Sequence, residues 1–107
     1  MKQSAGGQLE PKATGNGGLK VAESLLTLAN VHRDHGKAAL SEALYQQALG
    51  LMERAVGQGH PALAKALEEY AALLRRTRRQ AQAEEMEHRA EAIRAGQGVA
   101  ASVGSGR

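Results

Sequence analysis

The stretch "VGQGHPALA", residues 56–64, contains the strongest turn signal in the chain. Gly57 and Gly59 flank a single glutamine, and glycine commonly follows the end of a helix because it adopts backbone angles that other residues avoid. His60 and Pro61 come next, and proline suits the first turn of a helix, where the N–H that it lacks would have no partner. The stretch therefore predicts that one helix ends before it and that another begins within it.

Apolar residues recur at helical spacing on both sides of this turn, and the pattern predicts four helices. We expect them over about residues 21–35, 38–56, 61–74 and 80–95. Because β-branched residues are few, a sheet is disfavoured and the predicted fold class is all-α. The expected core faces are Val21, Leu25, Leu28, Ala29 and His32; then Leu40, Leu44, Tyr45, Ala48, Leu51, Met52 and Ala55; then Leu63, Leu67, Tyr70, Ala71 and Leu74; and last Ala83, Met86, Ala90 and Ile93.

The composition limits the functions that this chain can have. Its 107 residues suffice for one small domain. Cysteine, phenylalanine and tryptophan are absent, so alanine and leucine must supply the core, and a disulfide or a thiolate metal site cannot form. No apolar run is long enough for a signal peptide or a membrane span, so we expect an intracellular, cytoplasmic protein that does not contact membranes.

Both ends of the sequence are rich in glycine and polar residues. Residues 1–20 and 96–107 contain too few large apolar groups to offset the entropy lost on ordering, so we expect two disordered tails around a helical domain of residues 21–95. Gly96 is expected to end the fourth helix. The net charge of +3 comes mostly from the tails, which disfavours a nucleic-acid-binding function for the helical domain.

The helical domain contains an internal repeat. An offset of 42 residues places Leu25 on Leu67, and Ala29 on Ala71, in the first helix of each half. The same offset aligns the second helices, so the sequence describes one helix hairpin written twice. We place the two repeats at about residues 21–62 and 63–95.

Three segments of the sequence resemble the tetratricopeptide repeat family, in the 42-residue form of kinesin light chains. They are "LLTLANVHRDHGK" (25–37), "SEALYQQALGLMERAVG" (41–57) and "GHPALAKALEEYAALLRR" (59–76). Residues 57–61 match the Gly-x-x-His-Pro turn between repeats of that family. Small residues also match the family's helix crossings, namely Ala29, Ala71, Ser41, Ala83, Ala48 and Ala90.

The resemblance implies an α-α solenoid of two antiparallel helix hairpins that mediates protein–protein interaction without catalysis. On this interpretation the chain is a small adaptor or scaffold, and Gly57, His60 and Pro61 shape the turn between repeats. The His60 ring can hydrogen-bond backbone groups there, which favours a structural role over a chemical one.

Two departures from the family pattern concern the groove and the end of the array. The paired asparagines that clamp the backbone of a bound peptide in kinesin-type repeats are replaced by Leu26-Thr27 and by Glu68-Glu69, which disfavours binding of an extended peptide in the groove by that clamp. Glu87 stands where the family places a large apolar residue that packs on a following helix. We therefore interpret the fourth helix as the polar cap of the array.

The first helix is apolar over an unusually wide arc once Ala22 and Leu26 are included. We hypothesise that Leu26 and its neighbours are covered by a second copy, by another subunit or by the N-terminal tail. This predicts a homo-oligomer or a larger complex formed through the first helix.

The candidate partner-binding residues follow from the family's geometry and from the arginine-rich stretch "RRTRR", residues 75–79. The arginines could bind an acidic segment of a protein partner, or could remain solvated near acidic neighbours. The full candidate set is Glu23, Leu26, Asn30, Arg33, Lys65, Glu68, Arg75, Arg76, Arg78 and Arg79.

Motifs of catalysis, cofactor binding and metal binding are not found in the sequence, so we expect no enzyme, no cofactor and no metal. His32 with His35, and Glu85 with His88, have suggestive spacings but lack a second ligand set. Three functions stay open: a small adaptor, a structural subunit ordered by its neighbours in a large assembly, and a basic helical protein associated with nucleic acid.

Overall fold

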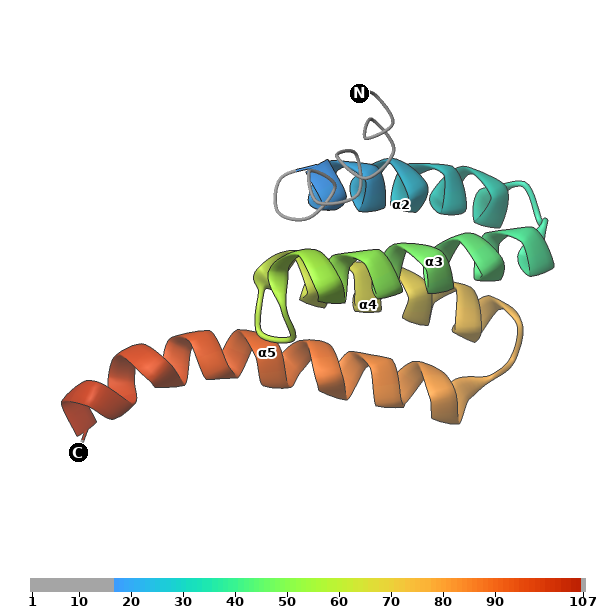
Figure 1. The fold of residues 1–107 in the computed structure, drawn as a ribbon. Coiled ribbons are helices and arrows are strands. Elements are labelled where there is room, and N and C mark those ends of the chain that lie inside the picture. Colours follow the sequence, from blue (N-terminus) through green and yellow to red (C-terminus); the bar gives the residue numbers. More distant parts are fainter. Residues whose placement is uncertain (1–16, 107) are drawn as a thin grey trace, which may run out of the picture.

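Four helices make up the described part of the chain. The computed structural model describes the backbone of residues 17–106 and the side chains of residues 17–96. In chain order the helices are α2 (Gly18–Asp34), α3 (Ala38–Val56), α4 (Pro61–Arg76) and α5 (Gln80–Gly106), and no strand occurs over the described backbone. Consecutive helices run antiparallel, and the hairpin α2–α3 stacks on the hairpin α4–α5 (Figure 1). The predicted all-α fold of two hairpins is therefore confirmed.

Small side chains line the crossings within each hairpin. The six residues expected there are fully buried: Ala29, Ser41, Ala48, Ala71, Ala83 and Ala90. Ser41 Oγ donates a hydrogen bond of 2.7 Å to the backbone carbonyl of Ala29, which joins α2 directly to α3. Because the distance between two helix axes depends on the side chains at the contact, alanine and serine let these helices approach closely.

The turn between the hairpins has the geometry that its sequence predicts. Gly57 has φ +86°, a left-handed backbone conformation that favours glycine. His60 precedes α4, and its ring Nδ1 accepts a hydrogen bond of 3.0 Å from the Ala62 N–H. Pro61 is the first residue of α4. The His60 ring thus satisfies one of the backbone donors that a helix start leaves unpaired.

The structure buries a different side of α2 from the one expected. Ala22, Leu26 and Ala29 form its buried face. Val21 and Leu28, expected in the core, are 50% and 49% exposed, and Leu40 at the start of α3 is 47% exposed. The apolar arc of α2 is wider than the surface that one neighbouring helix can cover. Helix α3 covers the side of α2 that carries the buried alanines. The expectation of a core position for Val21, Leu28 and Leu40 is therefore wrong.

Leu26 is covered by its own chain. It is only 5% exposed and belongs to the common core of the two hairpins. A second copy or another subunit is therefore not needed to cover Leu26, and that part of the hypothesis is wrong; the part that concerns the N-terminal tail lies outside the described residues. Exposed apolar side chains on α2 are instead Val21, Leu28 and Val31, which lie outside its buried face.

Two helix ends lie outside the predicted limits. Helix α2 begins at Gly18, so the last residues of the expected N-terminal tail are helical, and Leu19 packs against the core. Helix α5 continues through Gly96 to Gly106, although Gly96 was expected to end it. Glycine inside a helix costs only about 1 kcal/mol relative to alanine and does not by itself end the helix. The prediction of disorder for residues 1–16 lies outside the described residues.

The two hairpins differ at equivalent positions. Leu26 and Met52 of the first hairpin are buried, and at the same register the second hairpin has an ion pair of 2.7 Å between Glu68 and Arg94. Tyr45, fully buried, has Glu87 as its equivalent, and Glu87 pairs with Arg75 at 2.6 Å. The ion pair of Glu68 and Arg94 thus stands at the register of two buried apolar side chains, and Glu87 stands at the register of a buried tyrosine.

The turn within each hairpin needs a residue with a left-handed backbone, and the two hairpins supply different residues. Gly36 has φ +78°, and the equivalent residue in the second hairpin, Arg78, has φ +66°. A side chain in this conformation costs roughly 1–2 kcal/mol. The arginine therefore adds strain to the second turn that the first turn avoids.

Replacing Arg78 by glycine should make the protein more stable. The free energy gained by relieving the strain exceeds the free energy lost because glycine makes the unfolded chain more flexible. We therefore expect Arg78→Gly to raise the free energy of unfolding, measured by urea titration, by roughly 0.5–1 kcal/mol. Arg78→Ala removes the same charge but keeps the Cβ atom, so it should not be stabilised. An Arg78→Gly variant less stable than Arg78→Ala would contradict this explanation.

Candidate partner-binding groove

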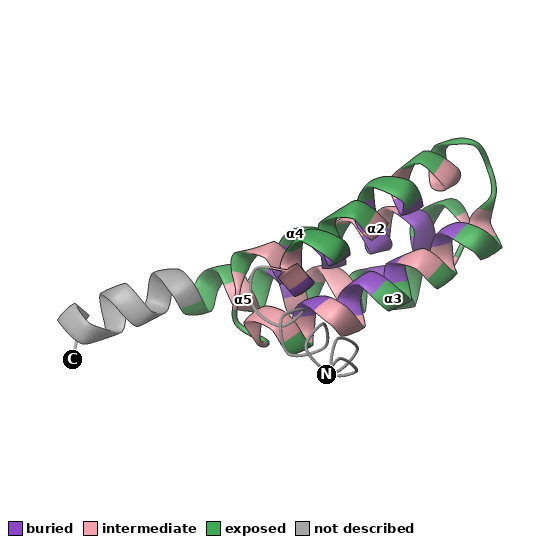
Figure 2. Ribbon diagram, turned by 45° about the horizontal axis from the view of Figure 1, so that its top comes forward, coloured by how far each residue is buried: buried purple, intermediate pink, exposed green. Residues whose placement is uncertain are grey.

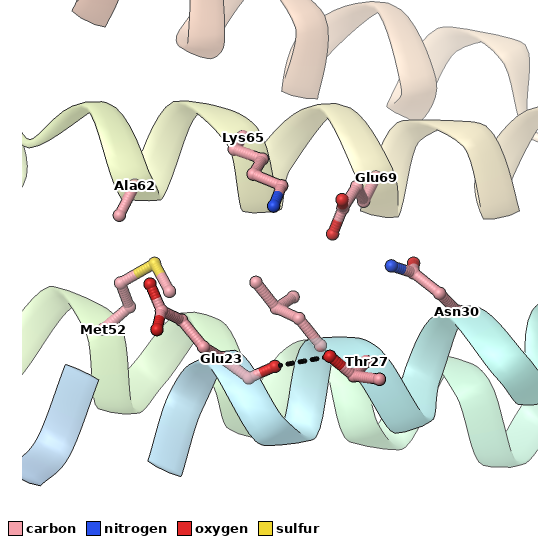
Figure 3. A pocket seen from close by; sticks show the side chains of 8 residues that line it. Glu23, Thr27, Asn30, Met52, Ala62, Lys65 and Glu69 are labelled. Carbon is pink, nitrogen blue, oxygen red and sulfur yellow. Dashed lines mark hydrogen bonds between the residues drawn. The ribbon is translucent and has the colours of Figure 1, made fainter. Parts of the chain in front are cut away.

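A groove runs between α2 and α4, the first helices of the two hairpins. Its volume is about 300 Å³. Figure 3 shows Lys65 and Glu69 reaching from α4 towards α2. The lining consists of Glu23, Leu26, Thr27, Asn30, Met52, Ala62, Lys65 and Glu69.

Helical spacing explains why these side chains meet. Glu23, Thr27 and Asn30 follow one another at intervals of four and three residues, so they share one face of α2. Lys65 and Glu69 are four residues apart on the facing side of α4. Beneath these polar groups lie Leu26 and Met52, both buried. The groove therefore has an apolar floor and polar walls of both charges.

Glu69 contributes to the groove a buried carboxylate oxygen that lacks a hydrogen-bond donor within the described residues. Its side-chain atom Oε1 is buried and has no hydrogen-bond partner among the residues that the structure describes. A buried acceptor without a donor costs roughly 1–3 kcal/mol. Such an atom is well placed to accept a hydrogen bond from a bound molecule.

Arg33 of α2 connects two residues of the groove, Asn30 and Glu69, through hydrogen bonds. Its NH1 atom donates to the Tyr45 hydroxyl at 2.9 Å and to the backbone carbonyl of Glu69 at 3.3 Å. The Tyr45 hydroxyl in turn donates to Asn30 Oδ1. Burial raises the pKa of Tyr45 to about 12, so this hydroxyl remains a donor across the physiological pH range. The network fixes the position of Asn30 in the groove wall.

The structure brings together only some of the residues proposed from the sequence. Glu23, Leu26, Asn30 and Lys65 line the groove, and Arg33 borders it. Glu68 points elsewhere and pairs with Arg94 of α5. Sequence reasoning missed Thr27, Met52, Ala62 and Glu69. The interval of four residues from Lys65 to Glu69 was the available signal, because it places Glu69 rather than Glu68 on the face of Lys65.

Three of the four arginines in residues 75–79 bind carboxylates of this chain. Arg75 pairs with Glu87, Arg76 with Asp34 at 3.3 Å, and Arg79 with Glu42 at 2.9 Å. The last two pairs join the second hairpin to the first. Arg78, the fourth arginine, is exposed in the turn. These pairs favour the structural interpretation of the arginine-rich stretch over binding of an acidic partner.

The pair of Arg79 and Glu42 belongs to a network at the boundary between the hairpins. Arg79 donates two hydrogen bonds of 2.9 Å to the Glu42 carboxylate, and the Tyr70 hydroxyl donates a third of 2.8 Å. The Arg79 guanidinium lowers the pKa of Glu42 below its usual value. Tyr70 also stacks against Tyr45, with ring centroids 5.5 Å apart.

Neither a metal site nor a membrane-spanning segment is found within the described residues. No group of three or more His, Cys, Asp or Glu side chains gathers closely enough there to hold a metal ion. His88 and Glu91 lie 3.8 Å apart on exposed α5, without further ligands. Over the same part of the chain, no helix has the length and apolar character needed to cross a bilayer.

Two stacked hairpins with a groove along their first helices define the class of α-α helical repeat proteins. Comparison with family models identifies the family: the tetratricopeptide repeat model matches residues 20–95, and the chain belongs to this family. Domains of this family generally mediate protein–protein interaction. No curated protein and no solved structure matches the chain. The resemblance to the kinesin light chain form stays a prediction.

The stability that Glu42 contributes should depend on pH. Because its pKa is lower in the folded state than in the unfolded state, its contribution is present above the unfolded value and is lost as the pH falls. We expect Glu42→Gln to lower the free energy of unfolding by about 1 kcal/mol at neutral pH. The difference from the wild type should begin to shrink below about pH 4.3, the usual pKa of a glutamate in the unfolded chain, and should vanish as the pH falls through the lower pKa of the folded state.

Urea titrations at several pH values measure this difference, with Glu85→Gln as the control. Glu85 is an exposed carboxylate on α5, and its substitution should change the stability by less than about 0.5 kcal/mol. A loss of stability in Glu42→Gln that is the same at neutral and acidic pH would contradict the role of the Glu42 charge.

Proposed function

We propose that the chain is a non-catalytic interaction module, a small adaptor that holds a segment of a partner protein in the groove between α2 and α4. The family supports interaction in general, and the groove supports a particular surface. The observation that carries the proposal is the buried Oε1 atom of Glu69, which lacks a donor within the described part of the chain. A bound segment would supply that donor.

The chemistry of the groove defines what fits it. Glu23 and Glu69 contribute two carboxylates and Lys65 a single ammonium group, so the walls carry a net negative charge. A segment with a lysine, arginine or amide group would satisfy Glu69. An apolar side chain one or two positions away would rest on Leu26 and Met52. The expected ligand is thus a short segment with one hydrogen-bond donor beside one apolar residue.

This ligand differs from the acidic segment considered for residues 75–79. Arg75, Arg76 and Arg79 already have carboxylate partners within the chain, and an acidic segment would have to displace them. The groove has no such internal competitor at Glu69. We therefore place the partner at the groove and not at the arginine-rich stretch.

A displayed library of random short peptides tests the proposal even though the natural partner is unidentified. Peptides selected on the wild-type protein should contain lysine, arginine or amide side chains beside an apolar residue. Fluorescence anisotropy should then show roughly tenfold weaker binding to Glu69→Gln, because a charge-assisted hydrogen bond is lost.

Glu84→Gln is the matched control, since Glu84 is an exposed carboxylate on α5 away from the groove. It should bind the selected peptides as the wild type does. Failure to enrich any peptide, or equal binding to the wild type and to Glu69→Gln, would contradict the proposed site.

A further inference from the structure

The outer side of α2 presents three large apolar side chains that the other described helices leave about half exposed. Val21, Leu28 and Val31 are 50%, 49% and 45% exposed, and intervals of seven and three residues place them on one face. Exposed residues run along this helix in Figure 2. The face is separate from the groove, because none of the three residues lines it.

The second hairpin shows what covers this face elsewhere in the molecule. The offset of 42 residues places Val21, Leu28 and Val31 on Leu63, Tyr70 and Leu73 of α4. All three equivalents are buried, with exposed fractions between 0 and 7%. Tyr70 stacks on Tyr45 of α3 and accepts a hydrogen bond of 3.3 Å from Gln46 of the same helix. The side of α4 that carries Tyr70 is therefore packed against a helix of the preceding hairpin, whereas no helix within residues 17–106 packs on the same side of α2.

In each hairpin, a basic residue follows the helix that carries this apolar face. Glu42 of α3 binds Arg79, which follows α4. The residue equivalent to Arg79 is Lys37, which follows α2 and is exposed. Within residues 17–96 the Lys37 ammonium group forms no ion pair. If a further helix packed on α2 in the way that α3 packs on α4, its equivalent of the Glu42 carboxylate would lie beside Lys37.

Two occupants supplied by this chain fit poorly. In a head-to-tail stack of two copies, α5 would have to cover α2, but α5 has Glu87, Glu91 and Arg94 at the register of Tyr45, Leu49 and Met52. Residues 1–16 contain only two large apolar side chains, Met1 and Leu9, which do not form a helical stripe. Neither of these occupants offers α2 the apolar stripe and carboxylate that α3 offers to α4.

We propose that the outer face of α2 docks an amphipathic helix of a partner protein. The partner helix carries a carboxylate followed three, seven and ten residues later by large apolar side chains. This is the pattern of Glu42, Tyr45, Leu49 and Met52 in α3. Its apolar stripe covers Val21, Leu28 and Val31, and its carboxylate binds Lys37.

The chain itself supplies the probe. A labelled synthetic peptide with the sequence of residues 38–56 carries the proposed pattern, and a side-chain crosslink between its positions 43 and 47 holds it helical, since short isolated helices are marginal in water. Both positions are exposed in α3, so the crosslink leaves the docking stripe intact. We expect saturable binding to the full chain by fluorescence anisotropy, weakened at least tenfold by Leu28→Glu.

Three further variants locate the site. Val31→Glu should weaken binding as Leu28→Glu does, which keeps the test valid if one variant fails to fold. Ala92→Glu changes an exposed position of α5 and should bind normally. Lys37→Glu should bind a few-fold more weakly, and a peptide in which lysine replaces the glutamate of position 42 should recover that loss. Leu28→Glu should bind the peptides selected on the groove as the wild type does, because Leu28 does not line the groove, so the two tests are independent.

Several results would overturn the proposal. One is the absence of saturable binding, and another is binding that Leu28→Glu and Val31→Glu do not weaken. Light scattering that detects a dimer abolished by Leu28→Glu would assign the face to a second copy. Peptide binding that occurs only after residues 1–16 are removed would assign it to the chain's own N-terminal segment.

Discussion

Close approach of the helices at alanine and serine is the constraint on which the rest of the structure depends. Ser41 and Ala29 meet between α2 and α3, and Ala71 and Ala83 are buried at the equivalent places in the second hairpin. Because both hairpins have small residues at the same register, both adopt the same shape and can stack. The stacking aligns α2 beside α4 and creates the groove between them.

The two ends of the stack have opposite character. At the α5 end, Glu87 and Arg94 form ion pairs at the register where α3 has the buried side chains of Tyr45 and Met52. At the α2 end, apolar side chains stay exposed where the second hairpin buries their equivalents. An array that is polar at one end and apolar at the other is suited to attachment from one side, while the groove remains open to a second partner.

Most of the fold could be predicted from the sequence, because helix spacing, turn residues and the repeat are local or periodic signals. The sequence could not decide which part of the wide apolar arc of α2 is buried, since that depends on where α3 lies, and Leu28 was misplaced for this reason. Several residues of the groove were predicted, but Glu69 was missed. Its neighbour Glu68 is also a glutamate and differs only in the face of α4 on which it lies. The partners of Arg76 and Arg79 lie 42 and 37 residues away, so no local pattern could reveal them.

Contact between the Tyr45 and Tyr70 rings tests the stacking of the two hairpins most directly. They are the two tyrosines of a chain without phenylalanine or tryptophan, so their ring proton resonances can be assigned without ambiguity. With ring centroids 5.5 Å apart, a nuclear Overhauser spectrum should contain cross-peaks between the two rings. If each ring shows cross-peaks to its own helix but none to the other ring, the hairpins do not stack as described, and neither the groove nor the equivalence of α2 and α4 would hold.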